Sequence, residues 1–191
     1  MNMPHVTSVG GYAFHLCARL ASADMPLVTN IGFASFHSCS SLMSVSLPQA
    51  TSIAQGSFYQ CSSLANVSMP LVGNVGEEAL AYCTSLTSVS MPLLTSVEGN
   101  AFQLCSSLTS FNAPDKLLLP TSLTSIGDSA FFQCTGLRGD LVIPSSVTSV
   151  GNRAFYQCTG FYSGPIVLNS GASVAANSFD QCCTVQPLPS S

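Results

Sequence analysis

Charged side chains are scarce in this chain of 191 residues, where they make up only 6 % of the composition, against about 25 % in an ordinary soluble domain. The basic residues are Arg19, Lys116, Arg138 and Arg153, and they do not cluster. Binding to nucleic acid needs clustered Lys and Arg to replace counterions, and binding to anionic lipid needs a polybasic patch. The sequence therefore argues against both classes of partner.

Long apolar runs are absent as well. Apolar residues make up 47 % of the chain and the mean hydropathy is +0.43, which excludes an intrinsically disordered chain. However, Ser, Thr, Gly and Pro interrupt every apolar stretch before it reaches the roughly 18 residues that a membrane-spanning helix needs. The N-terminal segment MNMPHVTSVGG lacks a basic stretch followed by an apolar one, so no signal peptide is visible. We predict no insertion into a membrane.

Motifs for catalysis are missing too. The chain has no G-x-S-x-G, no H-E-x-x-H and no glycine-rich phosphate loop, and we assign its acidic residues, including Glu77 and Glu78, to solubility. His15 and His37 lie 22 residues apart and could share a metal ion, but His5 does not fall in their register. Structural zinc usually needs four ligands. The sequence predicts no enzyme, no cofactor and no metal site.

What the chain does contain is a short internal repeat marked by cysteine. Cysteines recur at positions 17, 39, 61, 83, 105, 134, 158 and 182, so the gaps are 22 residues four times, then 29, 24 and 24. The residue three before each cysteine is Phe, except for Leu80 in the fourth unit. Such a period is typical of a solenoid, in which one unit forms one coil that cannot bury its apolar edge alone. We predict a single solenoid of about eight coils over residues 1–185, and a flexible tail over residues 186–191.

Each coil can be divided by its hydrophobic period. The segment LTSVSM (86 to 91) alternates apolar and polar residues, as a half-buried strand does, with Val89 and Met91 inward. The segment TSV (95 to 97) forms a second short strand, and Pro92 separates the two, since proline cannot donate a hydrogen bond to a strand ladder. In G-x-x-A-F-x-x-C the inward residues are spaced one and then three apart, which predicts a single helical or 3₁₀ turn.

The recurring cysteine has three interpretations: a disulfide framework, a metal site or a buried column. Coils stack about 4.8 Å apart, and residues in register have parallel Cβ vectors, so neighbouring cysteines stay farther apart than the roughly 3.8 Å between the Cβ atoms of a disulfide. The C-x₂-C spacing of zinc sites is absent. We predict buried, reduced thiols and an exposed Cys183. This structural ladder comprises Cys17, Cys39, Cys61, Cys83, Cys105, Cys134, Cys158 and Cys182.

Two longer segments carry a resemblance to a known family: LPTSLTSIGDSAFFQCTGLRGDLVIP (119 to 144) and IPSSVTSVGNRAFYQCTGF (143 to 161). Together with the five 22-residue units, they resemble the BspA-like leucine-rich repeats over nearly the whole chain. The resemblance implies a right-handed leucine-rich-repeat solenoid and a role in adhesion or in binding host proteins, as in surface proteins of Bacteroidetes-type bacteria and some protists. It implies no catalytic residue. The chain departs from ordinary leucine-rich repeats by lacking the Asn of L-x-x-L-x-L-x-x-N.

The outward residues of the first strand form a grid of small polar groups. This grid has three interpretations: a solvated face, a binding surface, or an ice-binding array, and its mixture of Ser, Asn and Asp argues against the third. The residue directly after the repeat Phe is aromatic in several units, as at Tyr59 and Tyr156. These aromatic residues either contact a sugar or protein partner or shield the core. The outward residues are Asp24, Ser44, Ser46, Asn66, Ser68, Ser88, Ser90, Ser110 and Asn112.

The 29-residue gap marks an insertion near residues 112–120, within FNAPDKLLLPTSL (111 to 123). Insertions in repeat arrays form loops on one face, often the binding face, which makes Lys116 a further candidate contact. The alternative is a junction between two repeat subtypes. Because the A-F-x-x-C register resumes at once, we place no domain boundary there.

These features suggest a non-catalytic binding or adhesion segment of a larger cell-surface or secreted protein. We expect it to recognise a host extracellular protein or glycan through the sheet face of the solenoid. The alternative is a structural spacer or stalk that presents other domains and binds nothing itself. Because the chain starts inside a coil and lacks a polar cap, we expect the remaining domains on its N-terminal side and fraying of the first coil.

Overall fold

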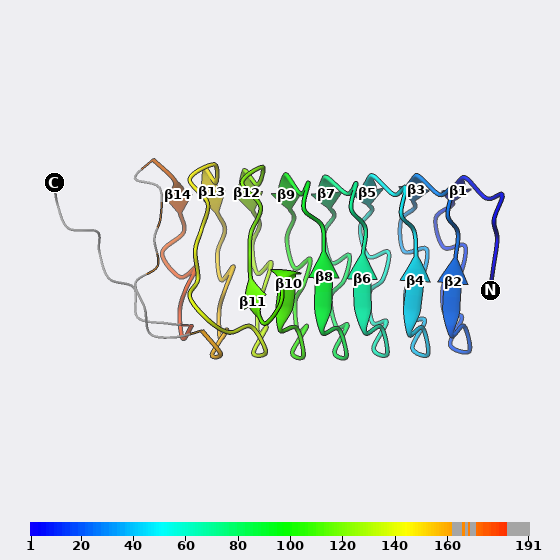
Figure 1. The fold of residues 1–191 in the computed structure, drawn as a ribbon. Helices are drawn as coiled ribbons and strands as arrows, with labels where there is room; N and C mark the ends of the chain where they lie inside the picture. The colour runs from blue at the N-terminus through cyan, green and yellow to red at the C-terminus, as the bar shows by residue number, and fades with distance from the viewer. Residues whose placement is uncertain (162–165, 167, 169–170, 183–191) are drawn as a thin grey trace, which may run out of the picture.

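A computed structural model describes residues 1–161, 166, 168 and 171–182. It is a parallel β-solenoid in which two sheets run along the stack (Figure 1), which confirms the predicted fold class. The eight-stranded sheet contains, in spatial order, β1 (Ser8–Val9), β3 (Asn30–Ile31), β5 (Ser52–Ile53), β7 (Asn74–Val75), β9 (Ser96–Val97), β12 (Ser125–Ile126), β13 (Ser149–Val150) and β14 (Ser173–Val174). The six-stranded sheet contains β11 (Lys116–Leu117), β10 (Ser110–Ala113), β8 (Ser88–Ser90), β6 (Asn66–Ser68), β4 (Ser44–Ser46) and β2 (Ser22–Asp24).

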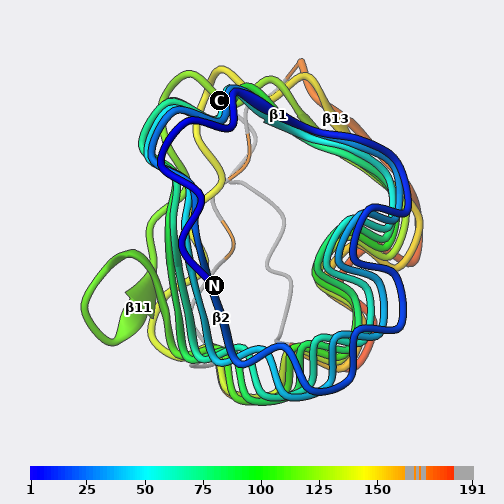
Figure 2. The same ribbon diagram turned by 90° about the vertical axis from the view of Figure 1, so that its right-hand side faces the viewer.

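Equivalent residues of successive coils pair directly, as the fixed repeat requires. In the six-stranded sheet Val67 pairs with Val89 and Ser68 with Ser90, and both Val side chains are buried while both Ser side chains are exposed. The alternation buries one face of each short strand and leaves the other in solvent. Seen from the N-terminal end, the coils superimpose as one outline that winds in the right-handed sense (Figure 2), as crossovers between parallel strands almost always do.

The wall between the two sheets, formed by residues 10–21 of the first coil and their equivalents, is called the turn wall below. The prediction of a helical or 3₁₀ turn here is wrong, because Tyr12 and Leu16 both have a left-handed backbone, with φ of 59° and 60°. Alternate backbone N–H groups therefore donate their hydrogen bonds to the next coil and not within their own coil. Phe36 N–H donates to the Ser57 carbonyl of the next coil at 2.7 Å, while Cys39 N–H donates to the Phe36 carbonyl at 3.1 Å. A helix would keep these bonds within one segment.

The core beside the turn wall is a column of stacked Phe rings. The ring centroids of Phe36 and Phe58 are 5.1 Å apart with 3° between the planes, and those of Phe131 and Phe155 are 5.2 Å apart with 5° between the planes. All four side chains are fully buried, as is Leu80, which replaces Phe in its coil. Burying one such side chain contributes about 1.5–3 kcal/mol, so the column stabilises every coil against its neighbours.

The insertion forms an antiparallel hairpin of β10 and β11, in which Ala113 pairs with Lys116. The hairpin projects outward from the stack of coils (Figure 2). The eight-stranded sheet passes the insertion without interruption, because Ser96 of β9 pairs with Ser125 of β12.

Cys183 and the tail over residues 186–191 lie outside the described residues. Within residues 1–161, 166, 168 and 171–182, no helix has the length and apolar character needed to cross a bilayer.

Candidate functional site

The sheet face, defined as the outward side of β2, β4, β6, β8 and β10, contains a shallow hollow of about 410 Å³. Three adjacent strands and the turn of the hairpin line it, with Pro114 at the hairpin. The structure thus brings together six of the predicted outward residues. They are Asn66, Ser68, Ser88, Ser90, Ser110 and Asn112.

The other predicted residues of the first strands continue the same face. Ser44 of β4 is in register with Asn66 of β6, and Asp24 of β2 is in register with Ser46 of β4. Asp24, Ser44 and Ser46 are all exposed. They do not line the hollow, but they extend its polar surface toward the N-terminal coils.

Some polar groups on this face already form hydrogen bonds within the protein. The Asn112 carboxamide accepts a hydrogen bond from Met91 N–H at 2.6 Å and donates to the carbonyl oxygens of Met91 and Leu118 at 3.4 and 3.3 Å. These bonds give Asn112 a structural role, and its predicted contact with a ligand stays a prediction. The Ser110 hydroxyl accepts Asp115 N–H at 3.0 Å and has a structural role as well.

The exposed Ser68 and Ser90 hydroxyls, by contrast, make no hydrogen bond to another described residue. The neighbouring Ser88 hydroxyl donates to Asn66 Oδ1 at 2.6 Å, which fixes the orientation of that amide. The hollow thus combines oriented and uncommitted polar groups.

Lys116 lies on the hairpin and is exposed. It borders a second hollow of about 560 Å³ between the hairpin and the next coil, where the exposed side chains of Leu118 and Val142 stand near Asp115 and Asp140. This hollow adjoins the hairpin but does not include the serines of the sheet face.

Tyr59 and Tyr156 lie on the turn wall and not on the sheet face. The Tyr59 ring stands between His37, at 4.8 Å between centroids, and Tyr82, at 5.3 Å. Burial, together with Tyr82 and Glu78, raises the pKa of Tyr59. Neither Tyr lines the hollow of the sheet face.

Farther along the same wall, Tyr156 stacks on Phe132 at 5.2 Å, with the Arg153 guanidinium 5.7 Å from the Tyr156 ring centroid. Several coils separate this pair from Tyr59. The two predicted aromatic contacts therefore belong to separate clusters.

The two histidines of the turn wall are neighbours, as the repeat spacing predicts. The ring centroids of His15 and His37 are 5.0 Å apart. Burial, followed by the influence of His15, lowers the pKa of His37. No group of three or more His, Cys, Asp or Glu side chains able to hold a metal occurs in the described part of the chain.

The cysteine ladder lies on the inner side of the turn wall, but Cys17 is exposed, so the prediction of burial is wrong for this residue. Cys39 lies against the carbonyl of Phe14 in the preceding coil, and Cys17 makes no such contact with another described residue. The buried members are Cys39, Cys61, Cys83, Cys105, Cys134, Cys158 and Cys182.

The thiols have a role that the sequence did not reveal. Cys61 Sγ–H donates to the Phe36 carbonyl of the preceding coil at 3.1 Å, and Cys134 Sγ–H donates to the Phe102 carbonyl at 3.0 Å. The carbonyl that accepts the thiol also accepts a backbone N–H, as when Cys39 N–H donates to Phe36. The same thiol bond recurs for Cys39, Cys83, Cys105 and Cys158.

Burial favours the protonated form of five of these thiols by raising the pKa of each. Desolvation is the largest cause of a rise in the pKa of Cys39 to about 11 and in that of Cys105 to about 12. It also raises the pKa of Cys61, Cys83 and Cys134. Because the thiolate is the nucleophile and the metal ligand, the ladder is suited to packing and not to catalysis.

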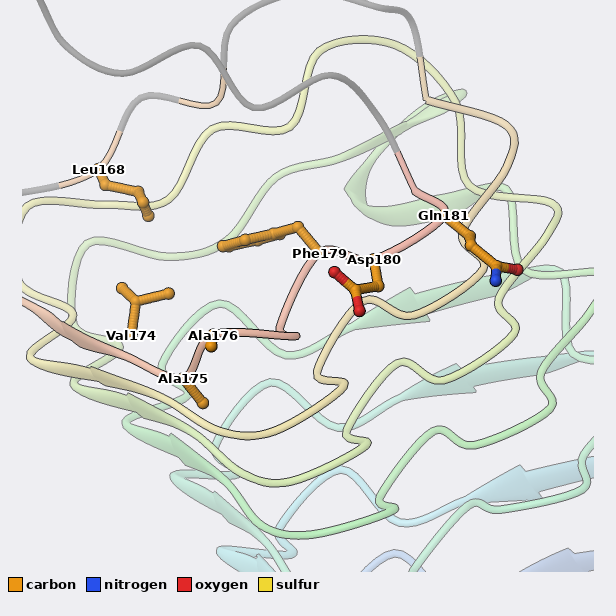
Figure 3. Close-up of a pocket in the computed structure, with 7 residues that line it drawn as sticks. All are labelled: Leu168, Val174, Ala175, Ala176, Phe179, Asp180 and Gln181. Carbon is orange, nitrogen blue, oxygen red and sulfur yellow. The ribbon is translucent and has the colours of Figure 1, made fainter.

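A third hollow, of about 420 Å³, opens at the C-terminal end of the described coils (Figure 3). Val174 and Phe179 line it. Both belong to the columns of inward apolar residues, whose members in earlier coils are covered by the following coil. The hollow is the end of the core column, so we assign no site to it.

Comparison with known families fits this architecture. The family described as BspA type leucine rich repeat region matches residues 7–118 and 115–188, in six copies. The chain belongs to the BspA-type leucine-rich repeat family. No match was found among curated proteins.

Solved structures share the fold of this BspA-type chain. The leucine rich repeat protein TpLRR of T. pallidum is 25 % identical, with a TM-score of 0.73, over 85 % of this chain and 77 % of that one. A leucine-rich repeat protein from Bacteroides ovatus ATCC 8483 is 20 % identical, with a TM-score of 0.55, over 95 % of this chain and 61 % of that one. The second similarity concerns the fold alone.

Proposed function

We propose that this BspA-type solenoid is a non-catalytic binding segment of a surface-exposed or secreted protein, and that it binds an extracellular protein ligand through the sheet face. The observation that carries the proposal is the hollow of about 410 Å³ across β6, β8 and β10, which the hairpin borders. Membership of a repeat family whose members serve as adhesion and protein-binding modules supports it.

The chemistry of the face favours a broad contact over a deep pocket. A neutral hydrogen bond contributes only about 0.5–1.5 kcal/mol net, whereas micromolar affinity needs about 8 kcal/mol. Single groups such as the Ser68 or Ser90 hydroxyl therefore cannot suffice. A ligand must therefore form hydrogen bonds with several coils and also make an apolar contact. Pro114, at the edge of the hollow, can supply that apolar contact.

Arginine substitutions on the sheet face test the proposal. The protein is screened against an array of extracellular matrix and serum proteins, and each ligand found is titrated against Ser68→Arg and Ser90→Arg. Both substitutions point outward, so the core is untouched while the hollow is blocked. We expect both to abolish binding, while Ser68→Ala and Ser90→Ala each weaken it by less than about tenfold.

Asn30→Arg is the matched control, because Asn30 is an exposed strand residue of the eight-stranded sheet. It adds the same charge on a different face and should leave binding unchanged. If the Arg variants of Ser68 and Ser90 fold by circular dichroism and bind as the parent does, the sheet face is only solvated. Absence of any ligand on the array would favour a spacer that presents other domains.

A further inference from the structure

A groove of about 520 Å³ crosses the turn wall of the first four coils. Each coil contributes the residue two after its core Phe or Leu, namely Leu16, Ser38, Gln60 and Tyr82 in turn. Ser40 and Ser62 line it beside them. The groove runs along the stack and lies on a different wall from the sheet face.

Two of the polar groups in the groove, the Ser38 hydroxyl and the Gln60 amide, are oriented by hydrogen bonds. The Ser38 hydroxyl lies 2.9 Å from His37 Nδ1 and donates to Gln60 Oε1 at 3.2 Å. This bond occupies the acceptor of the Gln60 amide and leaves its Nε2 donors without a partner among the described residues. A pre-oriented amide donor of this kind suits a neutral acceptor such as a hydroxyl or ether oxygen.

Apolar surfaces stand at both ends of the groove. Leu16 is 64 % exposed at one end. At the other end the Tyr82 ring is tilted by 56° against Tyr59, so the two rings are not stacked in parallel. Aromatic side chains combine an apolar ring with a polar tip, and such rings flanked by hydroxyl and amide groups match the alternating C–H and O–H surfaces of a sugar.

The wall offers no strand edge to a peptide. Its N–H groups already bond from coil to coil: Ser38 N–H donates to the Tyr59 carbonyl at 2.7 Å and Gln60 N–H to the Ala81 carbonyl at 2.9 Å. A peptide that binds by strand addition needs unpaired backbone groups. Recognition in this groove must therefore use side chains.

The charge of the groove lining and the spacing between coils restrict the class of ligand further. None of the side chains that line the groove is a carboxylate or a cation, although the exposed Arg19 follows the lining residue Ala18 in sequence, so the lining itself gives a polyanion no counter-charge. The rings of His15, His37 and Tyr59 repeat at 5.0 and 4.8 Å along the wall. These rings precede the lining residues Leu16, Ser38 and Gln60 in sequence, so their spacing gives the step between coils. One sugar unit of an extended oligosaccharide is similar in length to this step, so successive units can lie over successive coils.

From these observations we infer that the groove of the turn wall binds a neutral, extended oligosaccharide. Gln60 and the serines supply hydrogen bonds, and Leu16 and Tyr82 supply apolar contacts. This site goes beyond the proposed protein-binding function of the sheet face and does not depend on it.

Calorimetric titration with neutral hexasaccharides tests the inference. The probes are the extended linear hexasaccharides of glucose and of N-acetylglucosamine, both in β-1,4 linkage. We expect the parent to bind at least one of them, and Gln60→Ala and Tyr82→Ala each to weaken binding by about tenfold, the effect of one lost contact. Ser62→Arg, at a partly exposed position of the groove, should abolish binding without disturbing the core.

Tyr156→Ala is the matched control, because it removes an aromatic ring from the same wall several coils away. It should bind as the parent does. The inference is overturned if none of the hexasaccharides binds, or if Tyr156→Ala weakens binding as much as Tyr82→Ala. It is also overturned if the parent self-associates in sedimentation and Ser62→Arg makes it monomeric, because the groove is then a contact between copies of the chain.

Discussion

The side chain of Asn112 accepts the hydrogen bond of the Met91 N–H, which in other coils goes to a backbone carbonyl of the next coil. In earlier coils the N–H groups of Met25 and Met69 donate to the carbonyls of Ser46 and Ser90, each at 3.0 Å. At Met91 the next coil departs into the hairpin, and Asn112 Oδ1 accepts the N–H at 2.6 Å instead. The insertion is thereby joined to the sheet without leaving a buried donor unpaired.

Replacing Asn112 should destabilise the fold although the residue lies near the surface. In Asn112→Ala, the fully buried Met91 loses the partner of its N–H, which costs about 1–3 kcal/mol. The left-handed backbone at Asn112, with φ of 56°, disfavours Ala as well. Urea denaturation should show the loss as a lower midpoint.

Asn112→Gly separates the two causes, because Gly tolerates the backbone conformation and still removes the hydrogen bonds. It should lose part of the stability that Asn112→Ala loses. Ser68→Ala serves as the surface control and should change stability by less than about 0.5 kcal/mol. An unchanged midpoint for Asn112→Ala would show that water satisfies the Met91 N–H.

Two glycines at the same repeat position should respond oppositely to Ala. A Cβ at Gly32 would lie 2.7 Å from the backbone of both Gly10 and Gly11, whereas a Cβ at Gly10 meets nothing within 4 Å. Overpacking against backbone typically costs about 1–3 kcal/mol, so Gly32→Ala should lower the thermal midpoint. Gly10→Ala should leave it unchanged or raise it slightly. Equal midpoints for the two variants would contradict the close packing of the first two coils.

The sequence predicts the solenoid well because each coil repeats the same inward columns. Phe36 and Phe58, for instance, can be assigned to one column from spacing alone. The turn wall could not be predicted, because Tyr12 and Leu16 adopt left-handed conformations that carry no glycine signal. Only the stacking of coils, which pairs alternate N–H groups, stabilises these conformations.

The candidate site was only partly predictable for a related reason. The outward position of Ser68 and Ser90 follows from strand alternation. The structural role of Asn112 depends on the antiparallel pairing of the inserted hairpin, and the exposure of Cys17 depends on which coils lie beside it. Neither is encoded in the local pattern of apolar and polar residues.

Thiol reactivity should separate Cys17 from the buried cysteines. In a Cys183→Ser background, a thiol reagent should modify one group rapidly in the native protein, because Cys17 is exposed while Cys39 and the later ladder cysteines are buried. The remaining groups should react only after denaturation. Adding Cys17→Ser should remove the rapid phase. Rapid modification of several groups in the folded protein, or intact disulfides in mass spectrometry, would contradict the reduced ladder.

The same burial should make the fold sensitive to alkaline pH. Desolvation raises the pKa of Cys105 from an ordinary value of 9.0 to about 12, so the folded chain holds the thiol proton after the unfolded chain has lost it. The stabilisation of the folded state from this thiol is complete below about pH 9 and is lost as pH rises from there toward about 12, at up to about 1.4 kcal/mol per pH unit.

The free energy of unfolding, measured by urea denaturation between about pH 8 and about pH 10.5, should therefore fall as pH rises, and more steeply than one thiol explains, because Cys61, Cys83 and Cys134 also have raised pKa values. Cys105→Ala should be less stable than the parent at pH 8, since it loses the thiol bond to the Leu80 carbonyl, but its stability should fall less steeply with pH. Ser68→Ala, at an exposed position without a titratable group, should keep the slope of the parent. If the parent and Cys105→Ala lose stability in parallel, the tyrosines and not the buried thiols govern the alkaline transition.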